Sequence, residues 1–243
     1  YRPEVLAALG VADWRHLLPP IVDGTRQSHR LTPAAAARTG LPAGLPVMHG
    51  YVDMTCTVLG AGVYGTGEDV GVSILGSTGI HLRLIPDPDL VAPSAAMTGY
   101  CAPFSVPGHT TQMQTNMAGT LNIDWLLGRV CEAAALTSPG ATPDRAAALR
   151  ALDAAIGAAR PGAALYHPFI SSAGERGPFN DPYARAALLG LDQDVTLADL
   201  ARGIYEGIAF AARDCYAAMG NVPREIRLTG GAARSAAMHR ILA

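Results

Sequence analysis

The chain has 243 residues and a mass of 25.1 kDa, which is enough for one large domain or for one domain and part of another. Hydrophobic residues make up 49% of it, charged residues 16%, and the formal net charge is -2, which argues against a nucleic-acid partner, a membrane surface or a disordered tail. Because no apolar run is long enough to span a membrane and no signal-peptide pattern is present, we expect a soluble cytoplasmic protein.

Cysteine and lysine usage limit the chemistry that this segment can carry. The cysteines lie far apart without a CxxC pair, which argues against a zinc knuckle or a disulfide framework and predicts buried free thiols at Cys56, Cys101, Cys131 and Cys215. All 18 basic residues are arginine. The absence of lysine excludes, within these residues, a Walker-A lysine, a Schiff-base lysine and a lysine general base.

Both ends of the sequence suggest a partial chain. It begins at Tyr1 without an initiator methionine and stops at Ala243, inside a predicted helix that starts only a few residues earlier. We therefore expect a fragment, or a longer protein of which this is one part.

Helix signals punctuate the first part of the chain. A short helix is predicted over 2–9 and ends at Gly10, and residues 14–18 lead into two prolines. Thr32 and Pro33 then supply an N-cap and a first helical residue for a helix over 34–38, which Gly40 closes.

Asp53 is the one charged residue between a short predicted strand, 46–49, and an apolar helix, 54–61, with Gly50 as the break. We expect the strand to be buried and the first turn of the helix to hold the carboxylate. Because the unpaired N–H groups of a helix N-terminus favour negative charge, Asp53 is expected to stay ionised near neutral pH and could accept a proton. The alternative is that Asp53 only caps the helix.

Two strands joined by a turn of small residues are predicted next. Apolar residues alternate with small or polar ones over 70–74 and again over 80–84. The tip between the strands can offer clustered N–H and O–H donors to an anion such as phosphate, from Gly76, Ser77, Thr78 and Gly79. An ordinary hairpin turn favours the same residues, so the motif alone leaves both interpretations open.

The middle of the chain predicts one strand, a polar stretch and two helices. The strand covers 97–102, and the polar stretch over 109–116 could reach a cleft. The helices cover 117–134, with Leu121, Trp125 and Val130 facing the core, and 142–159, with Pro143 in its first turn. Pro139 and Gly140 mark the joint between them.

A loop over 171–183 follows a strand-like segment at 163–170 and is dense in glycine, proline and charge. Loops of this kind commonly carry binding residues. The plainer alternative is that Glu175 and Arg176 pair with each other at the surface.

The best-defined helix begins at Thr196, which forms a capping box with Asp199, and it ends at Gly220. A strand over 225–229, a sharp turn and a helix capped by Ser235 follow. Because glycine lets the backbone approach a flat ligand closely, this strand, glycine turn and helix predict a nucleotide pocket.

The order of these pieces resembles the FGGY family of carbohydrate kinases over nearly the whole chain. The matching motifs are the segment 31–47, Gly50-Tyr51-Val52-Asp53 with the family's catalytic aspartate, Gly76-Ser77-Thr78-Gly79 in the place of its Gly-Thr-Ser-Gly phosphate hairpin, and Gly174-Glu175-Arg176 with Pro178. The most specific match is the signature over 186–206, and 229–235 resembles the segment that lies against adenosine. In three places the sequence departs from the family: Ser77 and Thr78 are in reversed order, Gly203 stands where the signature prefers Ala or Ser, and Ala232 replaces a third glycine.

The resemblance implies an α/β protein with the actin-like, ribonuclease H-like ATPase fold, in which ATP and sugar meet in a cleft between two domains. On that basis residues 1–66 are the end of the first domain and residues 67–243 are the larger part of the second. The last elements of the second domain would follow Ala243.

The resemblance also implies roles for individual residues. Asp53 would take the proton from a sugar or polyol hydroxyl as that oxygen attacks the γ-phosphate of ATP. Gly76, Ser77, Thr78 and Gly79 would hold the terminal phosphates, Mg²⁺ would bridge phosphate oxygens, and Gly230, Gly231 and Ala232 would border adenine. His49 and Tyr51, beside Asp53, would contact the substrate, although ordinary structural roles are equally open to them. No residue is predicted as a direct metal ligand.

Substrate and partners follow from the same resemblance. Family substrates include ketopentoses, aldonates, glycerol and tetritols, and we expect a neutral polyol or ketopentose of the erythritol or xylulose type, with polar contacts from 112–116 as one option. Kinases of this family are often dimers, which makes a homodimer one option. An alternative of another class is an actin-like nucleotide-binding or regulatory module without kinase activity. Taken alone, the chain would lack half of the cleft and be inactive.

Overall fold

The computed structural model describes residues 1–65, 69–138 and 143–243. The chain divides into two compact units, Tyr1–Asp53 and Met54–Ala243. The domain boundary predicted at residues 66 and 67 falls outside the described residues and stays a prediction.

The first unit contains short elements. They are the helices α1 (Pro3–Ala8) and α2 (Pro33–Thr39), the 3₁₀ helix η1 (Ala12–Leu17) and the strands β1 (Ser28–Arg30) and β2 (Pro46–Met48). The predicted caps of α2 are confirmed, because Thr32 Oγ1 accepts from the Ala35 N–H at 3.2 Å and Gly40 adopts a left-handed φ of 73°.

The strand predicted before Asp53 is present, but the expectation that it is buried is wrong. All three residues of β2 are exposed, and β2 pairs with β1 in a two-stranded antiparallel sheet. A ribbon of two three-residue strands has too little surface to enclose a core of its own.

A five-stranded sheet with the order β5-β6-β4-β3-β9 forms the centre of the second unit. Its strands are β3 (Val70–Leu75), β4 (Gly79–Ile85), β5 (Tyr100–Pro103), β6 (Thr110–Asn116) and β9 (Glu225–Thr229). Neighbouring strands are antiparallel except β3 and β9, which are parallel. The hairpin of β3 with β4 and the strand β9 confirm the sequence prediction.

One face of this sheet is apolar. Its core joins Val72, Leu82 and Met113 to Phe104 and to Val58 of helix α3 (Asp53–Gly60). We refer to it as the apolar face. Alternation along β3 and β4 places these side chains together, because successive residues of a strand point to opposite faces.

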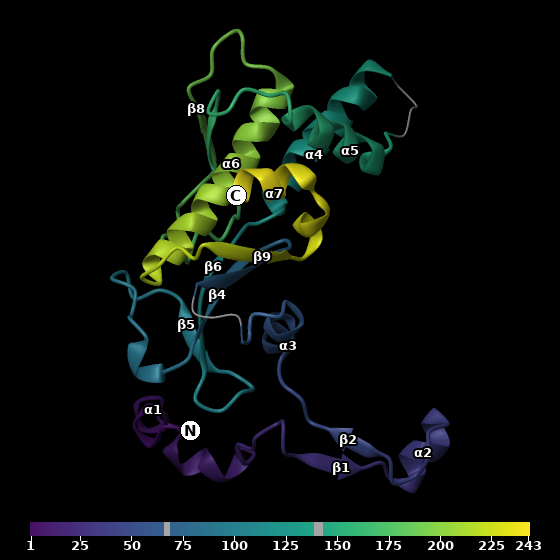
Figure 1. Cartoon of the computed structure of the whole chain (residues 1–243), viewed down its shortest axis with the longest axis vertical. Coiled ribbons are helices and arrows are strands. Elements are labelled where there is room, and N and C mark those ends of the chain that lie inside the picture. Colours follow the sequence, from purple (N-terminus) through teal and green to yellow (C-terminus); the bar gives the residue numbers. More distant parts are fainter. Residues whose placement is uncertain (66–68, 139–142) are drawn as a thin grey trace. The chain divides into compact units, whose positions relative to one another are not determined.

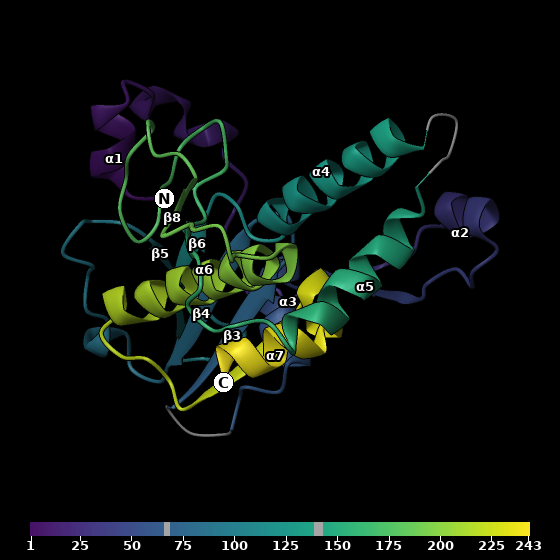
Figure 2. The same ribbon diagram turned by 90° about the horizontal axis from the view of Figure 1, so that it is seen from above.

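The opposite face lies under α6 (Leu197–Ala218), which contacts β4 and β6. The helices α4 (Leu121–Thr137), α5 (Arg145–Ile156) and α7 (Ala236–Leu242) pack with α6 around a second core that includes Leu127, Ile156, Ile204 and Met238 (Figure 1). In the view from above, α5 and α7 lie beside α6 (Figure 2). The predicted capping box of α6 is confirmed, and a Cβ on its Gly203 would stand 2.6 Å from the carbonyl oxygen of Ala164, the residue before strand β7 (Leu165–His167).

Two helix predictions need correction. Helix α4 begins at Leu121 instead of residue 117. Leu121 and Trp125 are 38% and 40% exposed, so their predicted burial is wrong, whereas Val130 packs partly buried against the core, as predicted; Leu126 and Leu127 are buried. The residues before Leu121 are bonded to the β3–β4 turn, which delays the helix. Helix α5 covers Arg145–Ile156 instead of 142–159, so the prediction of Pro143 in its first turn is wrong. Asp144 caps it, because its carboxylate accepts from the Ala146 and Ala147 N–H groups. Residues 139–142, including the predicted joint, lie outside the described residues.

The remaining elements are short. Strands β7 (Leu165–His167) and β8 (Ala187–Leu189) form an antiparallel pair, and β8 was not predicted. Strand β5 is shorter than predicted because Met97 and Gly99 have φ values of 53° and 80°, outside the extended region. The 3₁₀ helix η2 covers Pro88–Leu90. No helix among the described residues is both long and apolar enough to cross a membrane.

All four cysteines are free thiols, as predicted, but only Cys215 is buried. Cys56 and Cys101 are exposed and Cys131 is half-buried. Cys56 lies on α3 between the buried residues Thr55 and Val58, and the helical period turns it to the opposite side.

Candidate nucleotide site

The tip of the β3–β4 hairpin is held from outside by the segment that precedes α4. The Gly119 N–H donates to the Ser77 carbonyl at 2.7 Å, and Thr120 donates to the Gly76 carbonyl through its N–H at 2.7 Å and through Oγ1 at 2.9 Å. Within the turn, the Gly76 N–H donates to the Thr78 carbonyl at 3.1 Å. The carbonyl oxygens of Gly76 and Ser77 are therefore directed at the segment before α4, and that of Thr78 is bonded within the turn, which suits a turn that presents its other N–H groups to an anion.

The predicted glycine turn lies beside this hairpin. Strands β3 and β9 are parallel, with Ile74 opposite Thr229, so the segments that follow the two strands start at the same end of the sheet. Gly230 has a φ of 85°, and a Cβ there would stand 2.6 Å from the Leu75 carbonyl oxygen. Only glycine fits this position, because the left-handed conformation and the close approach to β3 both disfavour a side chain.

The turn continues into the 3₁₀ helix η3 (Gly231–Arg234) and then into α7, which Ser235 caps by accepting from the Met238 N–H at 2.9 Å. Around Gly231 the space that a Cβ would take is open. The structure thus brings together two predicted groups from distant parts of the sequence: Gly76, Ser77, Thr78 and Gly79 with Gly230, Gly231 and Ala232.

A cavity of about 540 Å³ lies next to the turn, within the size range of small-molecule sites. Its lining comes from α4, α5, α6 and η3 and includes Gly231 and Ala232 together with Thr120, Ile123, Asp124, Leu149, Arg150, Asp153, Ala154, Tyr205, Arg234 and Ser235. Thr120 belongs to this lining and also bonds to Gly76, so it joins the cavity to the hairpin. Apolar walls with a few charged groups suit a flat heterocycle.

Sequence reasoning missed the cavity residues of α4, α5 and α6. Leu149, Arg150, Asp153 and Ala154 have the spacing of one helix face, and this is the signal that the sequence contains. That spacing cannot show which neighbouring element the face meets. Local sequence patterns therefore could not predict which residues line the cavity.

Asp153 is the carboxylate that the cavity wall holds most firmly. Ser235 Oγ donates a short hydrogen bond to Asp153 Oδ1, and the Tyr205 hydroxyl donates to the same oxygen at 3.5 Å. Burial, followed by the charge of Asp153, raises the pKa of Tyr205 to about 12, so this hydroxyl stays protonated as a donor.

The residues predicted to contact substrate belong to the first unit. His49 Nε2 lies 3.0 Å from His29 Nε2, and the Tyr51 hydroxyl donates to Asp23 Oδ1 at 3.2 Å. Hydrogen bonds from Thr25 to the Asp23 carboxylate lower the pKa of Asp23. The pKa of Tyr51 is raised, first by burial and then by its hydrogen bond to Asp23. These bonds orient the two side chains on which the substrate prediction rests.

Asp53 lies in the first turn of α3, as predicted, although the helix begins at Asp53 instead of residue 54; Asp53 is exposed. It closes the first unit, whereas the hairpin and the glycine turn belong to the second. That Asp53, His49 and Tyr51 share one active site with the glycine residues stays a prediction.

Glu175 and Arg176 do not form the surface pair that was the alternative; each side chain anchors the loop to another part of the chain. Glu175 is only 2% exposed, and its Oε1 accepts from the N–H groups of Met117 at 2.9 Å and Arg176 at 2.8 Å. Burial is the main cause of its raised pKa. Arg176 Nε donates to Thr115 Oγ1 at 3.1 Å, so both side chains fasten the loop to the end of β6.

The polar stretch over 109–116, for which a cleft was one option, forms the buried strand β6. Gln112 and Gln114 of β6 donate through Nε2 to the carbonyls of Ala92 at 2.7 Å and Thr98 at 3.1 Å. Their amides therefore serve the packing of the second unit.

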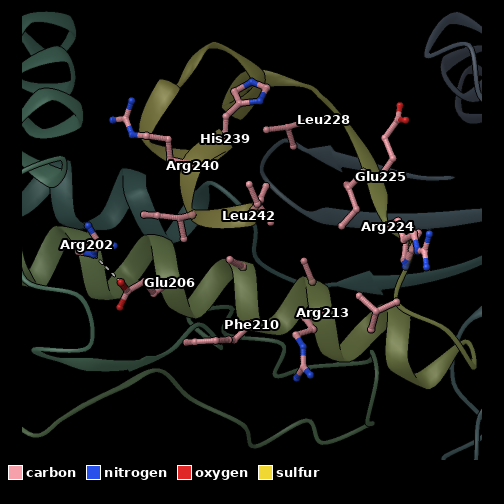
Figure 3. A pocket seen from close by; sticks show the side chains of 17 residues that line it. Arg202, Glu206, Phe210, Arg213, Arg224, Glu225, Leu228, His239, Arg240 and Leu242 are labelled. Carbon is pink, nitrogen blue, oxygen red and sulfur yellow. Dashed lines mark hydrogen bonds and ion pairs between the residues drawn. The ribbon is translucent and has the colours of Figure 1, made fainter. Parts of the chain in front are cut away.

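A larger cavity, of about 770 Å³, lies between α6, β9 and α7. Leu228 and Leu242 line it together with Arg202, which pairs with Glu206 at 2.7 Å (Figure 3). None of the predicted site residues is among its described lining. Volume alone therefore does not identify the site; the smaller cavity beside the glycine turn is the candidate.

Residues around the glycine turn bear on whether the site could accept ATP with Mg²⁺. Gly231 has open space where a Cβ would stand, and it lines the cavity of about 540 Å³. Among the described residues, no group of three or more histidine, cysteine or acidic side chains could hold a metal ion. Mg²⁺ that accompanies ATP takes most of its ligands from phosphate and water, so its binding with ATP would not require such a group.

Comparison with known proteins identifies the family. The C-terminal domain of the FGGY family of carbohydrate kinases matches residues 71–243. Erythritol kinase from Brucella abortus (strain 2308) is 49% identical over 246 residues, which cover 100% of this chain and 46% of that protein. Xylulose kinase from Escherichia coli (strain K12) is 28% identical over 232 residues, covering 94% of this chain and 44% of that protein.

Solved structures agree on the fold. The crystal structure of a xyloylose kinase from Brucella ovis superposes with a TM-score of 0.78 and 24% identity, over 100% of this chain and 46% of that chain. The chain thus spans about half the length of the relatives that it matches. It has the actin-like α/β fold of these kinases, and it belongs to the FGGY family of carbohydrate kinases.

Proposed function

We propose that the protein is an ATP-dependent carbohydrate kinase that transfers the γ-phosphate of ATP to a hydroxyl of a small polyol or ketopentose. The observation that carries the proposal is the shared edge of β3 and β9, where the hairpin of Gly76–Gly79 and the glycine turn lie side by side. Ligands of open α/β sheets bind outside the carboxyl ends of parallel strands. Membership of the family supports the same reaction class.

Erythritol, or a polyol of similar size, is the substrate that we favour. The relative that is 49% identical is an erythritol kinase, whereas the xylulose kinase of Escherichia coli is 28% identical. A neutral polyol is recognised by hydrogen bonds. His49 and Tyr51, each already held by a neighbouring side chain, would supply some of them.

The nucleotide would bind across the second unit. Adenosine would enter the cavity beside Gly231 and Ala232, and the terminal phosphates would meet the N–H and hydroxyl groups of the hairpin. Mg²⁺, when bound, neutralises charge on the phosphate oxygens. Residues of this chain then have mainly to align the reacting groups, which is the chief demand of phosphoryl transfer.

Asp53 would act as the general base. Its place at the first residue of α3 puts the carboxylate at a helix N-terminus, where negative charge is favoured. From there it would accept the hydroxyl proton of the substrate as the oxygen attacks phosphorus. General-base catalysis by a positioned carboxylate contributes roughly 10²–10⁴ in rate.

The test uses the protein at its natural length, with ATP, Mg²⁺ and erythritol, and follows ADP release. Asp53→Asn should lower kcat at least about 100-fold while the affinity for ATP stays unchanged. Asp13→Asn, which removes another exposed carboxylate of the first unit, is the matched control and should leave kcat within about twofold. Equal kcat values for the two variants would disprove the general-base role.

A further inference from the structure

The face of the central sheet that α6 covers is polar at the end where the hairpin turns. Ser73, His81 and Asn116 are 0%, 0% and 4% exposed, and Tyr216 and Cys215 of α6 are both 0% exposed. We refer to the side with Ser73, His81, Gln114 and Asn116 as the polar face. Burying a polar group costs free energy unless it forms a hydrogen bond. The hydrogen-bond partners of these side chains therefore bear on the role of this face.

The donor and acceptor of each hydrogen bond on the polar face can be assigned in turn, starting from the loop. The Gly177 carbonyl can only accept, so the Asn116 atom that lies 2.6 Å from it is the Nδ2 amide. Asn116 Oδ1 therefore faces His81 Nε2, at 3.0 Å, and this nitrogen must carry the proton. The Cys215 thiol donates to the same Oδ1 at 3.6 Å.

The order continues across the sheet. Burial lowers the pKa of His81 to about 4, so at neutral pH its Nδ1 carries no proton and accepts from Ser73 Oγ at 3.0 Å. Ser73 Oγ in turn accepts from the Tyr216 hydroxyl at 3.0 Å. One chain of bonds thus runs from α6 through β3 and β4 to β6 and ends on the loop at Gly177.

Asn116 lies where this chain meets the proposed phosphate site. Gly79, the last residue of the hairpin motif, pairs directly with Asn116, and a Cβ on Gly79 would stand 3.1 Å from His81 Nε2 and 3.3 Å from Asn116 Oδ1. On the other side, the loop is held at Gly177 by Asn116 and at Pro178 by Thr98 Oγ1, which donates to its carbonyl at 2.9 Å.

We propose that Asn116 is a positioning residue that fixes the phosphate-binding hairpin relative to the Gly174–Pro178 loop, by accepting from His81 under the hairpin and donating to Gly177 in the loop. This inference rests on the proposed kinase function for its purpose, since rigid donors are needed to hold phosphate, but its structural part can be tested alone. An amide is suited to the role because it accepts on one side and donates on the other. Neither a carboxylate nor an aliphatic residue of the same size can do both.

The decisive variant is Asn116→Asp. In its protonated form the new carboxyl group can still donate to the Gly177 carbonyl, but in its ionised form two acceptors face each other. The titratable groups around it are His81 from β4, Cys215 and Tyr216 from α6, and Glu175 from the loop. The quantity to measure is the ratio of the Kd for ATP of the variant to that of the unaltered protein at the same pH. We expect this ratio to be near 1 at pH 5.5 and about 10 at pH 8.

Two controls separate positioning from a general loss of stability. Met113→Ala removes a buried side chain from the same strand, but on the apolar face, and should leave the ratio of Kd values near 1 at both pH values. Adenosine, which lacks phosphate, should bind equally well to the unaltered protein and to Asn116→Asp. A ratio for Asn116→Asp that does not change with pH, or that Met113→Ala reproduces, would overturn the proposal.

Hydrogen exchange gives a readout that does not depend on nucleotide binding. At pH 8 the amides of Gly119 and Thr120, which donate to the carbonyls of the hairpin, should exchange about tenfold faster in Asn116→Asp than in Met113→Ala. If Asn116→Asp does not fold, Ser73→Ala takes its place, because it removes the donor to His81 Nδ1 at the other end of the chain of bonds. Equal exchange in the variant and the control would overturn the proposal. Absence of ATP binding by the unaltered protein would instead count against the kinase function.

Discussion

The two faces of the five-stranded sheet are both buried, but different forces hold them. On the apolar face, Val72, Leu82 and Met113 contribute through area removed from water, which is strong and non-directional. On the polar face, His81 and Asn116 contribute through hydrogen bonds that have only one workable direction. The polar face ends under the hairpin assigned to phosphate. Directional bonds thus replace apolar packing at the place where position matters most for the proposed function.

The largest effect is expected from the apolar face. Leu82 is 1% exposed, and Leu82→Ala leaves a cavity that should lower the free energy of unfolding by about 2–5 kcal/mol. Urea unfolding followed by Trp125 fluorescence in a Trp14→Phe background reports on the second unit, since Trp14 belongs to the first. A loss below about 1 kcal/mol would mean that this face is not a close-packed core.

Acid should weaken the polar face. His81 has a folded pKa of about 4 against an ordinary value of 6.5, so between these values the unfolded chain binds a proton that the folded one does not. Stability is therefore highest above pH 6.5 and should fall by up to about 3 kcal/mol as the pH drops toward 4. Urea unfolding at several pH values measures it. His81→Gln, which cannot titrate, should lack this part of the slope, and an unchanged slope would contradict the assignment.

The smallest effect sharpens the comparison at the hairpin itself. A Cβ on Gly79 would press on His81 Nε2 and Asn116 Oδ1 at 3.1 and 3.3 Å, whereas near Gly76 the closest atom is 4.0 Å away. Gly79→Ala should cost about 1 kcal/mol of stability, because the two polar groups cannot move without losing their bonds. Gly76→Ala should cost less than about 0.5 kcal/mol. Equal losses of unfolding free energy in the two variants, measured by the same urea unfolding, would show that His81 and Asn116 can shift without losing their hydrogen bonds.

Local signals in the sequence were enough for much of the fold. The capping box at Thr196, the strand β9 with Gly230 and Ser235, and the hairpin of β3 with β4 all depend on residues close together in the chain, and the structure confirms them. The glycine motifs of the candidate site were found for the same reason. Their side-by-side placement follows from the parallel pairing of β3 with β9.

What the sequence could not predict depends on partners far away in the chain. Glu175 is buried because its carboxylate meets the Met117 N–H, 58 residues away, and no local pattern contains that partner. Helix α4 begins late because Gly119 and Thr120 bond to the hairpin instead of extending the helix. The cavity wall at Asp153 likewise depends on Tyr205 and Ser235 from other elements.

Product formation tests the central claim most directly. The protein at its natural length is incubated with ATP, Mg²⁺ and, separately, erythritol, glycerol, xylulose, ribulose or gluconate, and ³¹P NMR follows each mixture. We expect a phosphoester of one compound, with erythritol favoured, to accumulate together with ADP. ATP binding without a phosphoester from any compound would contradict it and would favour an actin-like nucleotide-binding module.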